Sequence, residues 1–564
     1  MHACPSTSQH NSNDQSLDAC ISELTRGAHR LRTLSLASRS DLLDACATRV
    51  GRVADAWVRA ACGAKQIDAD QATAAEEILA GPSSMMRYLR LLSQTYRDVE
   101  TRGMPNLPGK IRTNSLGRRC VPIMPVKHLY DPLIFMGLQA EVWLKADSKA
   151  DDPVFVHSWL PEANARSRIA GVLGAGNVSA IPATDAFHKI FLEHEAVLLK
   201  LNPVNDYLFP IFQDAFQPLI DADLLRIVRG NHEFGEAMVR HPDIDSLHLT
   251  GSNLTHDAIV WGTDAEERSQ RRRDNQPLVT QSITSELGNV TPWVIVPGEY
   301  SRRQLLAQAE HVASSIVNNA SFNCIATKMI VTSRHWRQRD EFLELVDSVL
   351  RKIPPRVAYY PGAHDRFRRA AGVEAVRDDG TLPWTLIRDS KPSEQPHLFL
   401  EESFVCVCAE TQLDEGSPDA FLDAAVDFVN DKLFGTLCAT ITVPNSYRKQ
   451  HQKEIEQAID RLRYGAVCIN QWSGIVFGLM TPPWGGHHSA TIQSPQSGIG
   501  HVHNTFGLTN IDKTVLFGPL ASFPKPVWFP THQTSHRVGR SLISLYQRPS
   551  PLRLLPIFFH ALRG

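Results

Sequence analysis

The sequence predicts an α/β protein that is built around a parallel sheet and preceded by a helical region. Two patterns in the 564 residues carry this prediction. Between residues 169 and 250, short apolar segments alternate with segments of helical periodicity, which requires crossover connections between parallel strands. Before residue 103, apolar residues recur three and four positions apart, as in amphipathic helices. A chain of this length is expected to form two to four domains.

The elements of the predicted sheet follow one another in regular order. The expected strands are residues 169–174, 196–201, 224–228 and 246–250, and the expected helices are residues 185–195, 209–219 and 232–240. Ligands of such sheets bind at the carboxyl ends of the strands. We therefore expect the binding site in the loops that follow these strands.

The N-terminal part of the chain differs in character. Residues 1–16 are polar and are expected to be disordered. Helices are expected at residues 17–30, 38–63 and 69–97, and the segment 103–109, rich in Pro and Gly, is a linker candidate. A further strand is expected at residues 141–144.

Composition narrows the class of partner and the compartment. A net charge of -2 argues against a dedicated binder of nucleic acid or membrane surfaces and favours a small molecule. Ten irregularly spaced cysteines, without an apolar leader or spanning segment, favour a cytoplasmic protein. No metal site is expected, because Cys406 and Cys408 alternate as in a strand and the adjacent His487 and His488 should not share an ion.

The turn after the first expected strand only half-matches a dinucleotide-binding fingerprint. It reads Gly174-Ala175-Gly176-Asn177-Val178-Ser179, with Ser179 in place of the third glycine. Lys200 ends the second strand, where the usual fingerprint has an acidic residue. By itself this turn is a weak indication of a nucleotide site.

Cys324 lies near an expected helix–strand junction. Apolar residues at helical spacing precede it, and the segment 329–332 that follows is typical of a strand. A thiol at such a junction can face a cleft, although a free cysteine is more often buried core.

A series of motifs in the right order resembles the aldehyde dehydrogenase superfamily. The matching segments are Asn177, Lys200, Leu249-Thr250-Gly251-Ser252, Ser285-Glu286-Leu287-Gly288-Asn289, Phe322-Asn323-Cys324-Ile325-Ala326-Thr327-Lys328, Glu401-Glu402-Ser403-Phe404, Asn430 to Leu437, and Pro483-Trp484-Gly485-Gly486. The resemblance runs from about residue 169 to residue 486. It implies a Rossmann-type parallel-sheet cofactor domain and an α/β catalytic domain, here with a helical N-terminal extension.

The resemblance also implies the roles of the residues that carry it. Cys324 would be the nucleophile, Glu286 the base, and the Asn177 amide a donor to the oxyanion. Lys200, Gly251, Ser252, Glu402 and Phe404 would bind NAD or NADP. Pro203 replaces an acidic residue that the family often uses on the ribose, so the choice between the two cofactors stays open.

The same resemblance suggests a division into domains and a homo-oligomer. The expected parts are a disordered tail (1–16), a helical region (17–118), an NAD(P)-binding domain (119–285, completed by about 465–495), a catalytic domain (286–464) and a C-terminal tail (496–564) that packs on the sheet or serves as an oligomerisation arm. The charged segment 264–274 is expected to be an inserted surface loop.

Three functions remain open from the sequence. The favoured one is an NAD(P)-dependent aldehyde dehydrogenase that forms a thiohemiacetal and a thioester on Cys324 and hydrolyses the latter with the help of Glu286. An acylating relative would transfer the acyl group to CoA or run in reverse as an acyl-thioester reductase. A catalytically silent member would act as a binding or assembly protein. The aldehyde itself is not predicted, beyond a weak preference for apolar or aromatic compounds.

Overall fold

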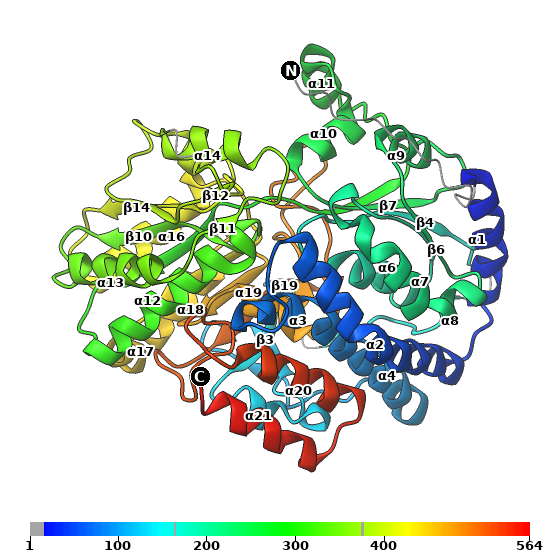
Figure 1. Cartoon of the computed structure of the whole chain (residues 1–564), viewed down its shortest axis with the longest axis horizontal. Coiled ribbons are helices and arrows are strands. Elements are labelled where there is room, and N and C mark those ends of the chain that lie inside the picture. The colour runs from blue at the N-terminus through cyan, green and yellow to red at the C-terminus, as the bar shows by residue number, and fades with distance from the viewer. Residues whose placement is uncertain (1–15, 150, 163–164, 374–376) are drawn as a thin grey trace.

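Two sheets dominate the fold of the computed structural model, which describes residues 16–149, 151–162, 165–373 and 377–564. A five-stranded sheet lies on the right of Figure 1 and a larger, ten-stranded sheet on the left. Below them, the blue helices α2, α3 and α4 lie next to the red C-terminal helix α20, whereas α1 lies at the right against the five-stranded sheet. The predicted α/β class with a helical lead-in is confirmed.

The five-stranded sheet is entirely parallel and has the order β6-β5-β4-β7-β8. Its strands are β4 (Ile169–Leu173), β5 (Ala196–Lys200), β6 (Leu225–Val228), β7 (Ser246–Thr250) and β8 (Ser282–Glu286). The register pairs Leu173 with Lys200 and Thr250 with Glu286, so the carboxyl ends of these strands align at one edge. All four strands predicted in this region are present.

The ten-stranded sheet is mixed and has the order β1-β2-β3-β19-β16-β15-β9-β10-β14-β13. Its strands are β1 (Arg112–Thr113), β2 (Arg119–Met124), β3 (Gln139–Leu144), β9 (Thr291–Ile295), β10 (Thr327–Ser333), β13 (Thr385–Ile387), β14 (Val407–Leu413), β15 (Cys438–Thr442), β16 (Ala466–Ile469) and β19 (Ile511–Phe517). Because β2 and β3 belong here, the smaller sheet begins only at Ile169. β19 pairs with β16 in parallel and with β3 in antiparallel orientation, which joins the C-terminal part of the chain to this sheet.

Helices cover both sheets and form a separate group from the two ends of the chain. Those around the sheets include α6 (Ile181–Phe191), α7 (Phe209–Ala215), α8 (Gln217–Asp221), α9 (His232–Val239), α10 (Asn253–Trp261), α12 (Arg302–Val317), α13 (Arg339–Lys352), α14 (Ala363–Ala371), α16 (Pro418–Lys432), α18 (Gln452–Arg461) and α19 (Gly474–Leu479). The group from the two ends comprises α2 (Leu36–Ala64), α3 (Ala75–Ile78), α4 (Ser84–Arg102), α20 (Ser535–Gln547) and α21 (Leu554–Ala561). The first helix, α1 (Leu17–Leu31), packs on the small sheet instead.

Several predicted boundaries were wrong for identifiable reasons. The helix expected at 185–195 begins at Ile181, because Pro182 suits a first helical turn, where its missing N–H is not needed. The helix expected at 69–97 is divided near Pro82. The segment expected to be a charged loop forms α11 (Ala265–Asp274), which Asp264 caps through its carboxylate. The expected disorder of residues 1–15 lies outside the described part of the chain.

The C-terminal helices pack on the N-terminal ones through buried polar contacts as well as apolar ones. On α4, the Arg87 guanidinium donates to both carboxylate oxygens of Asp131 at 2.7 and 2.8 Å and lies against the Tyr546 ring of α20. Arg90 donates to the Tyr546 carbonyl. The tail was expected to pack on the sheet; β19 does join it, whereas α20 packs on α2, α3 and α4.

None of the helices in the described residues combines the length and the apolar character that a bilayer crossing requires.

Candidate active site

Cys324 lies in the loop between α12 and β10, which confirms the predicted helix–strand junction. Its thiol is partly exposed, and its carbonyl accepts a hydrogen bond from Thr291 Oγ1 at 2.8 Å. Ahead of it, Asn319, Ala320 and Ser321 all adopt positive φ angles, between 52° and 70°. Side chains other than glycine rarely adopt this left-handed conformation, and each such residue costs about 1–3 kcal/mol.

Two buried lysines hold this loop from opposite sides. Lys65, at the end of α2, donates to Glu77 at 2.7 Å, to the Asn177 carbonyl at 2.8 Å and to Asn319 Oδ1 at 2.9 Å. Lys328 donates to Ser321 Oγ at 2.9 Å and to the Val405 carbonyl at 2.6 Å. These contacts fix a loop conformation that the loop's own sequence disfavours. Through Lys65, the N-terminal helix α2 contacts the loop that carries Cys324.

The predicted nucleophile and the predicted base are in direct contact. The Cys324 thiol donates to Glu286 Oε1 at 3.0 Å, and Trp484 Nε1 donates to Glu286 Oε2 at 2.8 Å. Burial raises the pKa of Glu286 to about 7, while the hydrogen bonds from Cys324 and Trp484 act in the opposite direction. Burial, and then the charge of Glu286, raise the pKa of Cys324 well above its ordinary value. The resting thiol is therefore neutral and faces a carboxyl group that ionises near neutral pH.

The side-chain amide of Asn177 reaches the same loop. Its Nδ2 donates to the Phe322 carbonyl at 2.9 Å and has a longer contact of 3.5 Å with Asn323 Oδ1. Asn177 follows β4, so the carboxyl edge of the small sheet delivers it to the loop that carries Cys324. The amide is thus held by the Phe322 carbonyl, and its contact with Asn323 is weak.

Two cavities meet at Cys324 and Glu286, which line both of them. The larger has a volume of about 1650 Å³ and extends over the carboxyl edge of the small sheet. The smaller has a volume of about 570 Å³, within the usual range for pockets that hold small molecules. The thiol is thus accessible from two directions.

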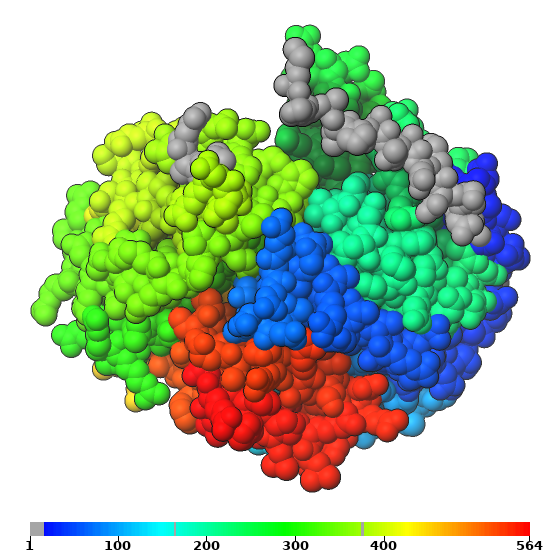
Figure 2. All heavy atoms as spheres, in the orientation of Figure 1, coloured from blue at the N-terminus to red at the C-terminus, as the bar shows by residue number. Residues whose placement is uncertain are grey.

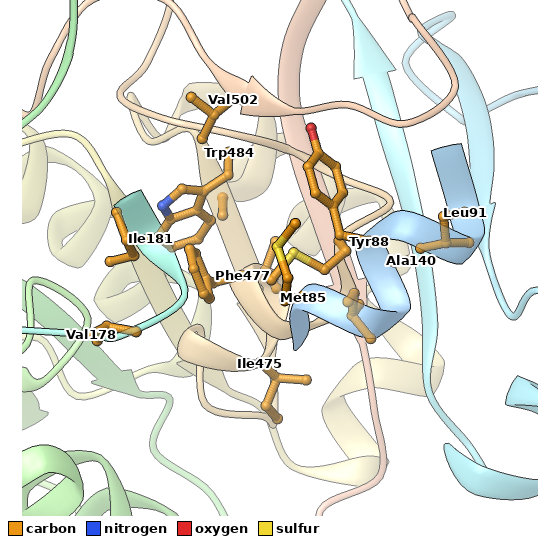
Figure 3. Packing of buried hydrophobic residues seen from close by; sticks show 14 of the residues in the cluster. Met85, Tyr88, Leu91, Ala140, Val178, Ile181, Ile475, Phe477, Trp484 and Val502 are labelled. Carbon is orange, nitrogen blue, oxygen red and sulfur yellow. The ribbon is translucent and has the colours of Figure 1, made fainter. Parts of the chain in front are cut away.

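Apolar and aromatic side chains form most of the wall of the smaller cavity. Figure 3 shows Ile181, Phe477 and Trp484 gathered next to one another, and the rings of Phe477 and Trp484 are 5.8 Å apart in an edge-to-face arrangement. Arg87 also lines this cavity, but its charge is balanced by Asp131. The smaller cavity therefore offers an apolar surface next to the Cys324 thiol.

The larger cavity brings together all five residues predicted to bind the cofactor. Lys200, Gly251, Ser252, Glu402 and Phe404 line it, together with the turn after β4. Ser252 caps α10 by accepting from the Thr255 N–H at 3.1 Å, so the N-terminus of this helix faces the cavity. A helix N-terminus attracts phosphate groups.

The side chains and backbone that line the larger cavity fit a dinucleotide. The Glu402 Oε1 atom is buried and has no hydrogen-bond partner among the described residues, which a ribose hydroxyl would supply. A Cβ at Gly288 would lie 2.5 Å from Glu402 Oε2, so only glycine allows this carboxyl to pack there. Burial lowers the pKa of Lys200, whose ammonium has only a 3.5 Å contact with the Leu201 carbonyl.

The sequence analysis missed Lys65 entirely. Lys328 and the Glu286 partner Trp484 lie in matched motif segments but were given no role there. The expectation that the adjacent histidines do not bind a metal stays a prediction, although His487 and His488 each approach Asp512 Oδ1 at 3.1 Å. Their donor atoms could hold a metal ion, although Arg118 also pairs with Asp512, at 2.7 Å, and would oppose a cation there.

Comparisons with known proteins find aldehyde dehydrogenases among the proteins that this chain resembles. A model of the aldehyde dehydrogenase family matches residues 200–357. Aminoacetaldehyde dehydrogenase from Pseudomonas aeruginosa is 26% identical over 293 residues, which are 48% of this chain and 52% of that protein. An aldehyde dehydrogenase from a Fusarium species is 26% identical over 163 residues, which are 28% of this chain and 31% of that protein. The matched part of the chain thus spans about half the length of the first relative and about a third of the second.

Solved structures are similar over most of the chain at low identity. An NAD-dependent aldehyde dehydrogenase from Sinorhizobium meliloti has a TM-score of 0.59 at 16% identity, covering 89% of this chain and 87% of that one. An NADP-dependent glyceraldehyde-3-phosphate dehydrogenase from Bacillus halodurans, complexed with NADP, has a TM-score of 0.58 at 14% identity, covering 88% and 90%. At these identities the likeness concerns the fold.

Proposed function

We propose that this chain, a divergent member of the aldehyde dehydrogenase family, oxidises an apolar aldehyde to its carboxylic acid with NAD or NADP. The observation that carries the proposal is the contact of Cys324 with Glu286 at the junction of the two cavities. A nucleophile and a base within hydrogen-bond reach form the minimal unit of covalent catalysis.

The first step is removal of the thiol proton. With a pKa of about 7, Glu286 is partly ionised at neutral pH, and its Oε1 atom lies 3.0 Å from the Cys324 sulfur. Transfer of the proton to Oε1 leaves a thiolate, which attacks the aldehyde carbon as the carbonyl electron pair moves to oxygen. The product is a thiohemiacetal on Cys324.

The developing oxyanion requires a donor close to the thiol. The Asn177 amide, already bonded to the Cys324 loop, supports this role together with the Cys324 N–H. When bound in the larger cavity, the nicotinamide supplies the hydride acceptor that converts the thiohemiacetal to a thioester. Lys200, Ser252 and Glu402 would hold that cofactor through its ribose hydroxyls and phosphates.

Release of the acid requires a water molecule and a base. Glu286 would first release to solvent the proton that it took from Cys324. It would then accept a proton from water as the oxygen attacks the thioester carbon, and the carbon–sulfur bond breaks to leave Cys324 as a thiolate. This second task of Glu286 favours hydrolysis over transfer to CoA. A thiol is much more acidic than water, so its attack on the thioester depends less on a base. The retained contact between Cys324 and Glu286 also argues against a catalytically silent protein.

The substrate class follows from the smaller cavity. Its aromatic and aliphatic wall, with Ile181, Phe477 and Trp484 near the thiol, favours apolar aldehydes over sugars and charged semialdehydes.

Absorbance of the reduced nicotinamide tests the proposal directly. Wild-type protein and Cys324→Ala are mixed with straight-chain and aromatic aldehydes and either NAD or NADP, with and without CoA. We expect reduction without CoA in the wild type and none in Cys324→Ala, while cofactor binding, measured by fluorescence quenching, persists in both. Turnover only with CoA would move the protein to the acylating class, and cofactor binding without any turnover would support a silent member.

A cytoplasmic location, a homo-oligomer and the expected domain division remain further parts of the proposal. The nine cysteines in the described residues are all free thiols, as expected in a reducing compartment. The oligomer rests on the family resemblance and is tested by light scattering after size-exclusion chromatography. In the domain division, the cofactor sheet starts at Ile169 instead of residue 119.

A further inference from the structure

The C-terminal segment 513–564 has an unusual charge balance. It contains seven lysines and arginines and no aspartate or glutamate, although the whole chain has a net charge of -2. Arg540 pairs with Asp55, and Lys513 with Asp512. Arg537, Arg548 and Arg563 are exposed and form no ion pair with any residue that the structure describes. The whole-chain charge therefore conceals a locally basic surface.

The same segment exposes a row of large apolar side chains. Leu552, Leu555, Phe559 and Leu562, here named the α21 face, are between 51% and 76% exposed. Leu555 and Phe559 lie four residues apart on α21, and Leu552 and Leu562 continue the same spacing just before and just after the helix. The opposite side is in the core, where Leu554 and Ile557 are buried. In Figures 1 and 2, the red C-terminal helices form the lower edge of the molecule.

The inner side of α21 belongs to the wall of the smaller cavity. Ile557, Phe558 and Ala561 line that cavity, as does Phe523, which is itself largely exposed. One short helix therefore separates an exposed apolar surface from the apolar cavity that reaches Cys324.

We propose that the α21 face attaches the protein to the surface of a membrane that contains anionic lipids. Leucine and phenylalanine on one face of a short helix, with arginines beside them, are the features of a helix that lies in the membrane interface. Arginines near such a surface are attracted by acidic headgroups. A second copy of the chain is disfavoured as the occupant, because it would present the same unpaired positive charges to this face.

Attachment through the α21 face would bring the smaller cavity close to the membrane. An apolar aldehyde dissolves in the bilayer, and a protein seated on the α21 face would hold the smaller cavity next to that reservoir. This step rests on the function proposed above, whereas the attachment itself does not.

Co-sedimentation with vesicles tests the attachment without any measurement of activity. We expect the protein to sediment with vesicles of equal parts phosphatidylcholine and phosphatidylglycerol and to bind phosphatidylcholine alone much more weakly. Binding should fall when salt is raised from about 0.1 M to about 1 M, because the screening length shrinks from about 10 Å to about 3 Å.

Matched variants locate the surface responsible. Leu555→Glu with Phe559→Glu should weaken binding to the anionic vesicles at least about tenfold. Leu254→Glu with Leu306→Glu adds the same charge at exposed positions on α10 and α12 and should leave binding unchanged. Arg548→Ser with Arg563→Ser alters only exposed side chains, so folding is not at stake, and it should reduce binding and its dependence on salt.

Three results would each overturn the inference. One is the absence of sedimentation with anionic vesicles under all conditions. Another is an equal loss of binding in the α10/α12 control. The third is a dimer that Leu555→Glu with Phe559→Glu dissociates while vesicle binding is unaffected, which would assign the α21 face to a second copy of the chain.

Discussion

Glu286→Gln is expected to make the protein more stable at about pH 8 while removing most of its activity. Burial raises the pKa of Glu286 from the ordinary value of 4.5 to about 7. The folded protein therefore binds more protons than the unfolded chain between these values, and stability is lost as the pH rises through that window.

The magnitude follows from the two pKa values. The difference between 4.5 and about 7, at about 1.4 kcal/mol for each pH unit, corresponds to about 3 kcal/mol of lost stability once the carboxyl is ionised. Glutamine carries no charge, and its oxygen can still accept from Trp484, but the Cys324 thiol loses its acceptor. We subtract about 1 kcal/mol for that hydrogen bond and expect a net gain of about 2 kcal/mol.

The assay is urea unfolding of wild type and Glu286→Gln at about pH 8 and about pH 4, with the aldehyde oxidation rate measured on the same samples. Glu100→Gln, at an exposed position on α4, is the matched control and should change neither quantity. The gain should vanish at the lower pH, and the oxidation rate at neutral pH should fall by about 10²–10⁴-fold, as for loss of a general base. Equal stability of the two proteins at both pH values would refute the argument that Glu286 is a destabilised carboxylate.

Four further variants probe the rest of the site. Trp484→Phe removes a donor to the Glu286 carboxylate and should move the midpoint of the pH–rate profile above that of the wild type. An unchanged midpoint would show that Glu286 is not the group whose ionisation controls the rate. Asn177→Ala should lower kcat by about 10²–10³-fold with little change in the aldehyde KM, in steady-state kinetics, and a pure KM effect would contradict its role on the oxyanion. Lys200→Ala should raise the KM for NAD or NADP more than it lowers kcat, and unchanged cofactor binding would remove Lys200 from the site. Lys65→Met leaves Glu77 buried without its partner and should lower the unfolding free energy by about 3 kcal/mol in urea titrations; a loss below about 1 kcal/mol would show that the Cys324 loop does not depend on this lysine.

The chemistry of the site could be predicted because it depends on residue types in a fixed order. Cys324 follows an expected helix and Lys200 ends an expected strand, whereas Glu286 was identified by its motif alone. Ligands of a parallel sheet were expected at the carboxyl ends of its strands, and the register of the small sheet aligns Lys200 with Leu173 and Glu286 with Thr250 at that edge.

Element boundaries were predicted less well where short-range signals compete. Pro182 was not recognised as the first turn of α6, and the arginine-rich segment was taken for a loop because its polarity conceals the helix that Asp264 caps. In both cases the residue that begins the helix was present in the sequence, but the prediction relied on the overall composition of the segment instead.

By itself, then, the sequence determined the fold class, because periodicity encodes it. Its motifs predicted Cys324 as the nucleophile and Glu286 as the base. Tertiary structure alone decided that Lys65 and Lys328 hold the nucleophile loop, that two cavities meet at Cys324, and that α21 separates one of them from solvent. These features join residues more than two hundred positions apart, as in the contact of Lys65 with Asn319, or depend on the volume left between packed elements. Neither long-range contacts nor cavities produce a periodic pattern in the sequence.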